Sequence, residues 1–338
     1  MDEIVQKAIA HNEASRKTSV PWKADEPYSQ QHFLFNKTKQ EWESQTAASA
    51  TGETVSPSDS PAIARLALYA WNVDFMLPYA ESRMEAALST LQNLTSQIPS
   101  TTAVVIYLQE CLQLDLDTIS KQPWIRERFA VTDLTGENWA SGYYGTTTLV
   151  DRRLPITALF RVHYEKTRME RDGLFVDVLM GKARDKKVRL CNSHLESLAT
   201  MPPYRPPQVE VIARFLKEGG VDAGVAAGDF NAIQDFDRTL HSDNGLKDAY
   251  LELGGKEDSD EGYTWGQQAA TSLRDQFGCS RMDKVYFTGA LELKGFERFG
   301  ADVQLEDQRQ REKLVALGFE KPWITDHLGI RAELQINE

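Results

Sequence analysis

The residues RLALYAWN (65–72) and AVVIYLQE (103–110) are two short, strongly apolar runs, separated by a segment from Tyr79 to Ile98 that has the spacing of an amphipathic helix. Apolar runs of this length, rich in aliphatic and aromatic residues, predict strands. Each run ends abruptly in a polar residue, Asn72 or Glu110. The segment therefore predicts a strand, a helix and a second strand, with polar side chains at the strand ends.

The same alternation continues toward the C-terminus. Further strands are predicted at Tyr144 to Val150, Ile156 to Phe160, Leu174 to Met180, Val188 to Ser193, Val225 to Phe230, Met282 to Phe287 and Leu328 to Leu334, and further helices at Leu112 to Ser120, Pro207 to Glu218 and Glu306 to Leu317. Strands outnumber helices, and residues 144–160 and 174–193 have the succession of hairpins, which fits poorly with a purely parallel sheet. We expect an α/β fold, a four-layer α/β sandwich over residues 62–338, with two mixed β-sheets face to face and helices outside.

Residues 1–61 differ from the rest of the chain and predict an N-terminal arm. Residues 1–18 predict a marginal helix. The strings HFLFN (32–36) and QEWES (40–44) flank a short polar turn and predict a hairpin packed on the main domain. The stretch from Thr46 to Ser60 has almost no large apolar residue and predicts a flexible linker.

Length and composition narrow the class of protein. A chain of 338 residues has room for one large domain or two ordinary ones. The net charge of −12 argues against a long basic face, so a polyanionic substrate would need a local site with a metal cation. The three cysteines are widely spaced, which excludes a disulfide framework and a thiolate zinc site. No apolar run reaches roughly 18 residues and no signal peptide is present, so we expect a soluble, monomeric protein of the nucleus or cytoplasm without a membrane partner.

Polar residues that suit phosphate chemistry stand at the ends of the predicted strands: Asn72, Glu110, His194, Asp229, Asn231, Asp283, Asp326 and His327. Carboxylates are ligands for Mg²⁺ or Mn²⁺, and imidazoles can donate to a phosphoryl group. Each position also has a simple structural explanation. Glu110 fits a solvated strand end, His194 a half-buried histidine, residues 228–231 an Asx turn, and Asp326 with His327 a loop hydrogen bond. Their joint occurrence favours a single site at one rim of the sheets.

The strings AWN, LQE, SHLES, GDFNA, RMDKVYF and TDHLGI, in this order over residues 70–330, resemble the endonuclease/exonuclease/phosphatase family of metal-dependent phosphodiesterases, which have a DNase I-like fold. The strings WNVD, SHLES in full, Tyr263-Thr264-Trp265 and Gly142-Tyr143-Tyr144 resemble its tyrosyl-DNA phosphodiesterase branch. That branch hydrolyses the 5′-phosphotyrosyl bond between DNA and a topoisomerase-derived tyrosine in DNA repair.

The resemblance implies a role for each site residue. Glu110 would be the main metal ligand, with Asn72 beside it and Asp326 supporting the metal. Asp229 would orient and deprotonate the attacking water, and Asn231 would hold the phosphate. His194, and His327 paired with Asp283, would donate hydrogen bonds to the charge that develops on phosphorus. The implied cofactor is Mg²⁺, with Mn²⁺ as an alternative.

The resemblance also implies contacts with a single-stranded DNA 5′ end that carries a tyrosyl adduct. Tyr143 and Trp265 would stack on DNA, with Phe277 as a weaker candidate, although Trp265 also fits a core anchor under a loop. Two arginines of the branch are replaced here, at Leu198-Ala199 and at residues 232–234. Arg205 is the first candidate to take their place, followed by Arg238, Arg274 and Arg281.

The missing arginines leave other activities of the family open. These are RNA deadenylation, abasic-site cleavage, and hydrolysis of a phospholipid or an inositol phosphate. A catalytically silent binding module with the same fold is the alternative outside enzymology, and the intact set of polar site residues argues against it.

Overall fold

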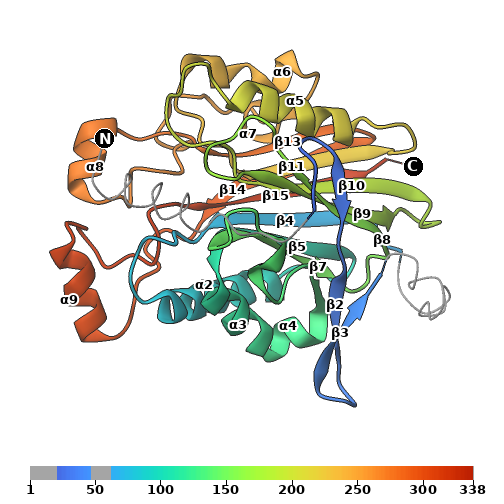
Figure 1. Cartoon of the computed structure of the whole chain (residues 1–338), viewed down its shortest axis with the longest axis horizontal. Helices are drawn as coiled ribbons and strands as arrows, with labels where there is room; N and C mark the ends of the chain where they lie inside the picture. The colour runs from blue at the N-terminus through green and yellow to red at the C-terminus, as the bar shows by residue number, and fades with distance from the viewer. Residues whose placement is uncertain (1–20, 47–61, 338) are drawn as a thin grey trace.

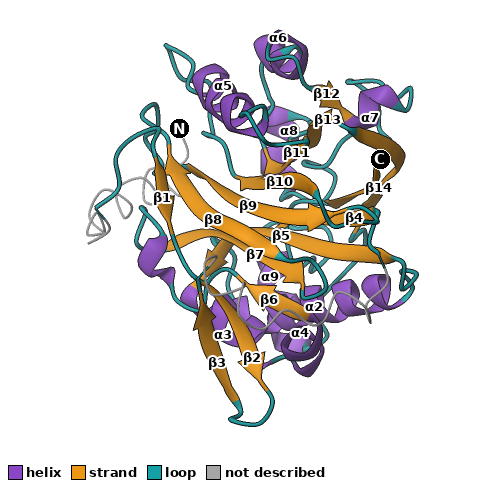
Figure 2. Cartoon of the chain, turned by 90° about the vertical axis from the view of Figure 1, so that its right-hand side faces the viewer, coloured by secondary structure: helices purple, strands orange, loops and turns teal. Residues whose placement is uncertain are grey.

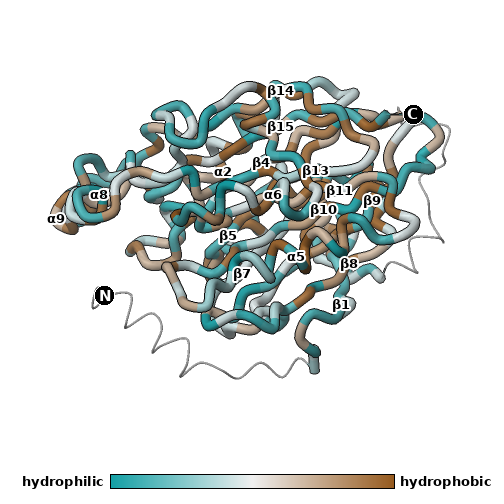
Figure 3. Tube along the Cα trace, turned by 90° about the horizontal axis from the view of Figure 1, so that it is seen from above, coloured by the Kyte–Doolittle hydropathy of each residue, from teal (hydrophilic) through white to brown (hydrophobic). Residues whose placement is uncertain are grey.

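Two β-sheets lie face to face with helices on both outer sides in the structure, a computed structural model (Figure 1). It describes residues 21–46 and 62–337. Apolar residues concentrate along the strands inside the molecule (Figure 3). In the part of the chain that is described, no helix is long and apolar enough to cross a membrane.

Both sheets are mixed, as the sequence predicts. One has the order β14 (Leu291–Phe299), β15 (Gly329–Ile336), β4 (Arg65–Asn72), β5 (Thr102–Leu112), β7 (Tyr144–Asp151), β6 (Phe129–Val131), β2 (His32–Asn36), β3 (Glu41–Gln45). The other has the order β1 (Pro27–Ser29), β8 (Ile156–His163), β9 (Asp172–Met180), β10 (Lys186–Ser193), β11 (Ala223–Asp229), β13 (Asp283–Gly289), β12 (Lys247–Asp248). Only β4–β5 and β10–β11 are parallel pairs among these strands, and each lies near the middle of its sheet.

The central strands are buried on both faces because alternate side chains point to opposite sides. In β4, Leu66 and Leu68 pack in the cluster between the two sheets. Tyr69 and Trp71, on the other face, pack in the cluster that contains helix residues such as Leu88. This explains why β4 reads as a continuous apolar run rather than as an alternation.

The helices form the outer layers (Figures 1 and 2). α2 (Ala80–Ser96), α3 (Gln113–Lys121) and α4 (Pro123–Arg128) cover the eight-stranded sheet, and α5 (Arg205–Leu216) and α6 (Leu240–Asp243) cover the other. α7 (Ala249–Glu252) packs at the edge of the sandwich against β13 of one sheet and β14 of the other. α8 (Thr271–Phe277) and α9 (Gln308–Ala316) lie together at one end. The four long predicted helices correspond to α2, α3, α5 and α9, with boundaries shifted by one or two residues.

The sequence analysis did not predict β14. This strand lies at the edge of its sheet, and its residues alternate between half-buried and exposed because one face meets solvent. Its ladder with β15 also shifts register between Leu293 and Gly295. Charged residues and an interruption of this kind are typical of edge strands and hide the apolar period.

Residues 21–46 extend both sheets. β1 pairs with β8, while β2 pairs with β3 where the sequence predicts a hairpin and also meets β6. Gln30 Nε2, between β1 and β2, donates to the carbonyl of Thr132 at 3.0 Å. This part of the predicted arm is therefore hydrogen-bonded into the sandwich. The predicted helix at residues 1–18 and most of the predicted linker lie outside the described residues.

Arg161 of β8 is fully buried and ties the two sheets together. Its Nη2 donates to both carboxylate oxygens of Asp133 at 3.0 Å, and its Nη1 lies 3.1 Å from Oδ2 of Asp172. Its Nε donates to Gln30 Oε1 at 2.9 Å. Burial alone would lower the pKa of the guanidinium, but the two carboxylates outweigh it and raise the pKa. The cation and its two buried anions therefore depend on one another.

We predict that Arg161→Met lowers the free energy of unfolding by at least about 3 kcal/mol, because it leaves Asp133 and Asp172 buried without a cation. Urea denaturation followed by circular dichroism measures the loss. Lys37→Ala is the control, since its ion pair with Glu127 is exposed and contributes at most about 1 kcal/mol. A loss below about 1 kcal/mol for Arg161→Met would show that water or other groups neutralise the two carboxylates.

Candidate active site

The eight predicted site residues lie together at one edge of the sandwich. The parallel strands β4, β5, β10 and β11 end at this edge, and β13 and β15 begin there. Asn72 Nδ2 at the end of β4 donates to Asp229 Oδ2 at the end of β11 at 2.9 Å. The site is therefore built from both sheets.

Gly228 makes the close approach of β10 and β11 possible. Its φ is +138°, and a Cβ at this position would lie 2.1 Å from the carbonyl oxygen of Ser193. Only glycine fits such a contact without moving the backbone. The glycine of the GDFN string thus brings Asp229 next to His194.

Asp229 lies at the centre of the site between two imidazoles. His194 Nε2 lies 3.3 Å from its Oδ2 and His327 Nε2 lies 3.6 Å from it. Its Oδ1 accepts a hydrogen bond from the backbone of Asn231 at 2.8 Å. Burial alone would raise the pKa of Asp229, but the two histidines outweigh it and hold the pKa well below its ordinary value. Asp229 is therefore an ionised base in the folded protein.

His327 is oriented by Asp283. Its Nδ1 lies 2.8 Å from Asp283 Oδ2, and its Nε2 faces Asp229. Burial alone would lower the pKa of His327, but the surrounding carboxylates, Asp283 foremost, raise it well above its ordinary value. The ring therefore carries a proton on Nε2 that it can donate into the site.

His194 has a cationic partner instead. Arg171 Nη1 lies 2.7 Å from His194 Nδ1, and a guanidinium can only donate, so Nδ1 accepts and the ring proton is on Nε2. Burial lowers the pKa of His194, and the charge of Arg171 lowers it further. His194 is thus a neutral donor that faces Asp229.

Arg171 was missed by the sequence analysis, and so was the residue that positions it. Glu196 of the SHLES string is buried and accepts hydrogen bonds from Thr167 Oγ1 at 2.7 Å and from the backbone of Arg168. Thr167 Oγ1 in turn accepts from the backbone of Arg171 at 3.0 Å. A second ionisable residue inside a histidine motif was the available signal that this loop is held in place.

Glu110 lies at a register shift in β5, with φ +60°. This backbone turns the carboxylate into the site, where Oε2 accepts a hydrogen bond from the backbone of Phe75 at 3.0 Å and Oε1 lies 3.8 Å from His194 Nε2. A non-glycine residue with positive φ inside a strand is strained. The strained backbone at Glu110 thus coincides with one of the predicted site residues.

Three carboxylates with oxygen ligands for a hard cation share this side of the site. Burial raises the pKa of Asp74 to about 8, and the negative charges of Asp326 and Glu110 raise it as well. Each of these acids disfavours the ionisation of the others, and a bound divalent cation would stabilise their ionised forms. Glu110 and Asp326 are therefore acids whose negative charges a divalent cation would balance, and Asn72 lies two residues before Asp74 in the chain. Asp74 was not predicted.

A second group of ligand atoms lies nearby. Atoms of Asp229, Asp283 and His327 come within 4.8 Å of one another, which would also suit a metal ion. Asp283 and His327, however, already hydrogen-bond each other through those atoms. Two of the three ligand groups in this set are therefore already engaged with each other.

Trp265 supports Asp326 rather than facing solvent. Its Nε1 donates to Asp326 Oδ2 at 2.7 Å, and only 9% of the residue is exposed. Its ring packs with Ala269 and Met282. In this structure little of the ring is available for stacking on a base, and Trp265 acts on the site by positioning Asp326.

The other two aromatic candidates are exposed. Tyr143 is 42% exposed and meets Phe75 edge-on, with ring centroids 6.0 Å apart. Phe75 stacks on Tyr144 at 4.2 Å and donates its backbone N–H to Glu110, so Tyr143 stands at the rim of the site. Phe277 is 61% exposed at the end of α8.

The structure differs from the prediction that Arg205 contacts the substrate. It is 2% exposed, and its Nε and Nη2 donate to the carboxylate of Asp237 at 2.8 and 2.7 Å. Its remaining nitrogen donates to the carbonyls of Glu196 and Leu198. It therefore anchors the loop after the SHLES string and is not placed to contact a substrate. The reserve candidates are engaged as well, since Arg238 pairs with Asp258, Arg274 with Glu320 and Arg281 with Asp248.

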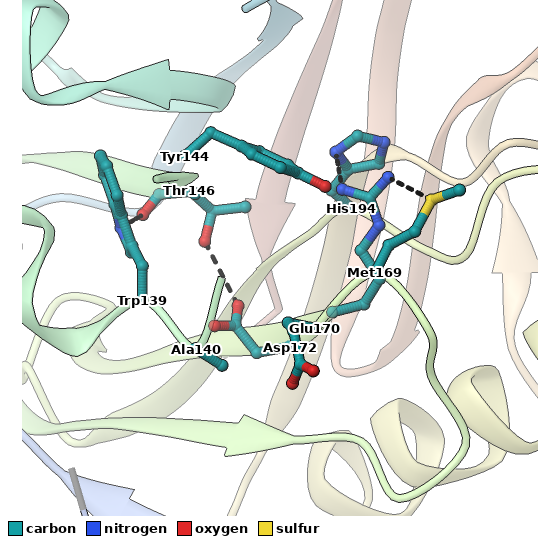
Figure 4. Close-up of a pocket in the computed structure, with 10 residues that line it drawn as sticks. Trp139, Ala140, Tyr144, Thr146, Met169, Glu170, Asp172 and His194 are labelled. Atoms are coloured by element: carbon teal, nitrogen blue, oxygen red, sulfur yellow. Dashed lines mark hydrogen bonds between the residues drawn. The ribbon is translucent and has the colours of Figure 1, made fainter. Parts of the chain in front are cut away.

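A small pocket borders the site on the Arg171 side (Figure 4). His194 lies at one end and Trp139 at the other, with Tyr144 between them. The guanidinium of Arg171 lies 5.5 Å from the centre of the Tyr144 ring. This pocket adds a cation and aromatic rings to the carboxylates and imidazoles.

Comparison with known proteins now decides the family. A sequence model of the endonuclease/exonuclease/phosphatase family matches residues 59–327. The chain belongs to this family. The resemblance drawn from the motifs is thereby confirmed, and the fold is the one expected of its members.

Solved structures of similar fold include tyrosyl-DNA phosphodiesterase 2 (TDP2). A truncated TDP2 of Caenorhabditis elegans is 23% identical, with a TM-score of 0.58 over 80% of this chain and 97% of that one. D. rerio TDP2, complexed with a single-strand DNA product, is 18% identical, with a TM-score of 0.59 over 80% and 99%. The human Nocturnin catalytic domain, with a bound sulfate anion, is 14% identical, with a TM-score of 0.55 over 81% and 95%. A search of curated protein sequences found no match.

We predict that His194 is neutral with its ring proton on Nε2 in the metal-free protein, and that Arg171→Met raises the pKa of the ring, because the positive charge that lowers it is removed while Asp229 and Glu110 remain. ¹⁵N shifts of the imidazole followed over a pH titration report both the tautomer and the pKa. Arg168→Met is the control, because its exposed guanidinium lies over Tyr204, 5.7 Å from the ring centre. An unchanged pKa of His194 in Arg171→Met would contradict a role for Arg171 in keeping the ring neutral.

Proposed function

We propose that this protein is a divalent-metal-dependent phosphodiesterase that acts on the 5′ end of single-stranded DNA carrying a tyrosyl adduct, as in DNA repair. The observation that carries the reaction is the Asp229 carboxylate, ionised and buried between a neutral and a cationic imidazole. That arrangement combines a base for water with two donors for a phosphoryl oxygen. Family membership and the fold support it.

The residues divide the reaction among them. Asp229 accepts the proton of the attacking water, and the backbone N–H of Asn231 keeps its other oxygen in place. Nε2–H of His194 and of His327 donates to the charge that develops on the phosphoryl oxygens. Asp283 holds the His327 ring so that its second nitrogen faces the site. Asn231 Nδ2 donates to the carbonyl of Leu195 at 3.1 Å, which leaves its second amide hydrogen for the phosphate.

Glu110, Asp326 and Asn72 would hold the cation, and Asp74 adds a fourth oxygen-bearing side chain on that side. A divalent cation at this place supplies neutralisation of the phosphodiester charge. We propose Mg²⁺, with Mn²⁺ as a substitute, because every side chain on this side of the site offers oxygen rather than sulfur.

The proposed substrate rests on two observations. Tyr143 is exposed at the rim beside Phe75, where an unpaired base can stack on it. A structure of similar fold, D. rerio TDP2, holds a single-strand DNA product. Binding of only the strand end is compatible with the net charge of −12, because a strand end held by a few contacts needs no long basic groove.

A substrate panel tests the proposal: a 5′-tyrosyl oligonucleotide, plain single-stranded DNA, an abasic duplex, poly(A) RNA, a phospholipid and an inositol phosphate, each with Mg²⁺ and with EDTA. We expect release of tyrosine from the first, dependent on Mg²⁺. Efficient cleavage of another substrate with no tyrosine released would reject the DNA 5′ end and keep the metal mechanism. No hydrolysis of any of them would favour a binding module with this fold.

We predict that Glu110→Gln abolishes Mg²⁺-dependent turnover and leaves the melting temperature nearly unchanged, because the side chain is part-exposed and the amide keeps its shape but loses the anionic ligand. Activity assays over a Mg²⁺ titration measure the loss. Glu137→Gln, the same substitution at an exposed residue, is the control. Near-normal activity of Glu110→Gln at saturating Mg²⁺ would contradict the assignment.

We also predict that His327→Ala lowers kcat about a hundredfold or more with little change in KM, since a donor aimed at transition-state charge contributes about 2.7–4 kcal/mol. Asp283→Asn is expected to cost less, because the ring remains but loses its orientation. Steady-state kinetics on the best substrate of the panel provide both constants. A raised KM with an unchanged kcat would make His327 a binding residue instead.

A further inference from the structure

A basic groove lies at the end of the eight-stranded sheet opposite the site. It has a volume of about 410 Å³ and is lined by the end of α2, the loop that leads into β5, the end of α4 and the turn after β7. Thr102 lines it at the start of β5, and Glu110 lies eight residues further along the same strand. At about 3.3 Å per residue the two places are roughly 25 Å apart, so the groove is separate from the catalytic residues.

Three arginines line the groove: Arg128, Arg152 and Arg153. Arg153 is neutralised, because its Nε and Nη2 donate to the carboxylate of Asp151 at 2.9 and 2.6 Å. The other acid of the groove, Glu127, pairs with Lys37 at 3.1 Å. Both acids of the groove are therefore already bound to cations.

Arg128 and Arg152 have only neutral partners within residues 21–46 and 62–337. Arg128 donates to the carbonyl and the hydroxyl of Thr95 at 3.3 and 3.4 Å, and Arg152 donates to the carbonyl of Arg126 at 3.3 Å. Burial lowers the pKa of Arg152, as expected of a cation partly removed from water without a counter-charge. Two positive charges without a carboxylate partner in one groove form a local positive site, to which an anion is attracted although the protein carries a net charge of −12.

A backbone hydrogen bond brings the two arginines together. The N–H of Arg152 donates to the carbonyl of Arg128 at 2.9 Å, which links the turn after β7 to the end of α4. Arg128 also covers a carbonyl near the C-terminal end of α2, where the helix dipole would otherwise repel an anion. The groove thus contains two guanidinium groups from residues whose backbones are hydrogen-bonded to each other.

We propose that this groove binds the phosphate group of a small phosphorylated molecule. Guanidinium groups match phosphate oxygens in geometry and charge, and a volume of about 410 Å³ suits a small-molecule ligand. Two cations without carboxylate partners match the charge of one phosphate group, whereas successive phosphates along a bound strand would need a longer row of cations than these two. The site is independent of the reaction proposed above.

Isothermal titration of the full chain with pyrophosphate and with AMP, in EDTA, tests the proposal. We expect binding that weakens at least tenfold in Arg152→Glu, whose side chain is exposed, and that is kept in Arg152→Lys. Arg309→Gln, an exposed change on α9, is the control and is expected to bind as the native protein does. Arg152→Glu is also expected to keep its melting temperature and its hydrolytic activity.

Three outcomes would overturn the proposal. The first is no binding of either phosphate compound at millimolar concentration. The second is equal binding by Arg152→Glu and the native protein, which would place the phosphate elsewhere, for instance at the catalytic histidines. The third is binding of a short oligonucleotide much more tightly than AMP in an Arg152-dependent manner, which would make the groove a nucleic-acid contact.

Discussion

The hydrogen bond from Asn72 to Asp229 joins the two sheets at the edge that holds the candidate site. Asn72 ends β4 of one sheet and Asp229 ends β11 of the other, 2.9 Å apart. A second bond of this kind, Gln109 Nε2 to Asn192 Oδ1 at 2.8 Å, lies beside it and is fully buried. Buried polar groups must be paired, so these bonds fix how the two sheets align. Every other site residue takes its position from that alignment.

A line of alternating charge and polarity runs through the site. Asp283 orients His327, His327 faces Asp229, Asp229 faces His194, and His194 accepts from Arg171. The two histidines therefore differ although both face the same carboxylate. One is held by an anion and is cationic, while the other is held by a cation and is neutral. The environment, and not the residue type, decides the protonation state of each ring.

Most of the arginines discussed above are paired with carboxylates, so few positive charges remain to bind an anion. The arginines near the site in sequence mostly anchor loops, as Arg205 does through its ion pair with Asp237. The charge of Arg161 is neutralised by carboxylates between the sheets. Arg171 reaches the candidate site, and Arg128 and Arg152 at the far end have no carboxylate partner among the residues that the structure describes. A net charge of −12 is thus compatible with anion binding at two confined places.

The sequence by itself determined the four-layer architecture, the family and the eight polar residues of the site, because apolar periodicity and motif order are local properties of the chain. It did not reveal the edge strand β14, whose solvent-facing residues hide the apolar period. Only the tertiary structure decided which charged side chains reach the site. Arg205 turns away to Asp237, Trp265 is buried against Asp326, and Arg171 arrives from a loop held by Glu196. The physical reason is that a long side chain goes to whichever carboxylate, carbonyl or ring packs beside it, and those neighbours come from distant parts of the chain.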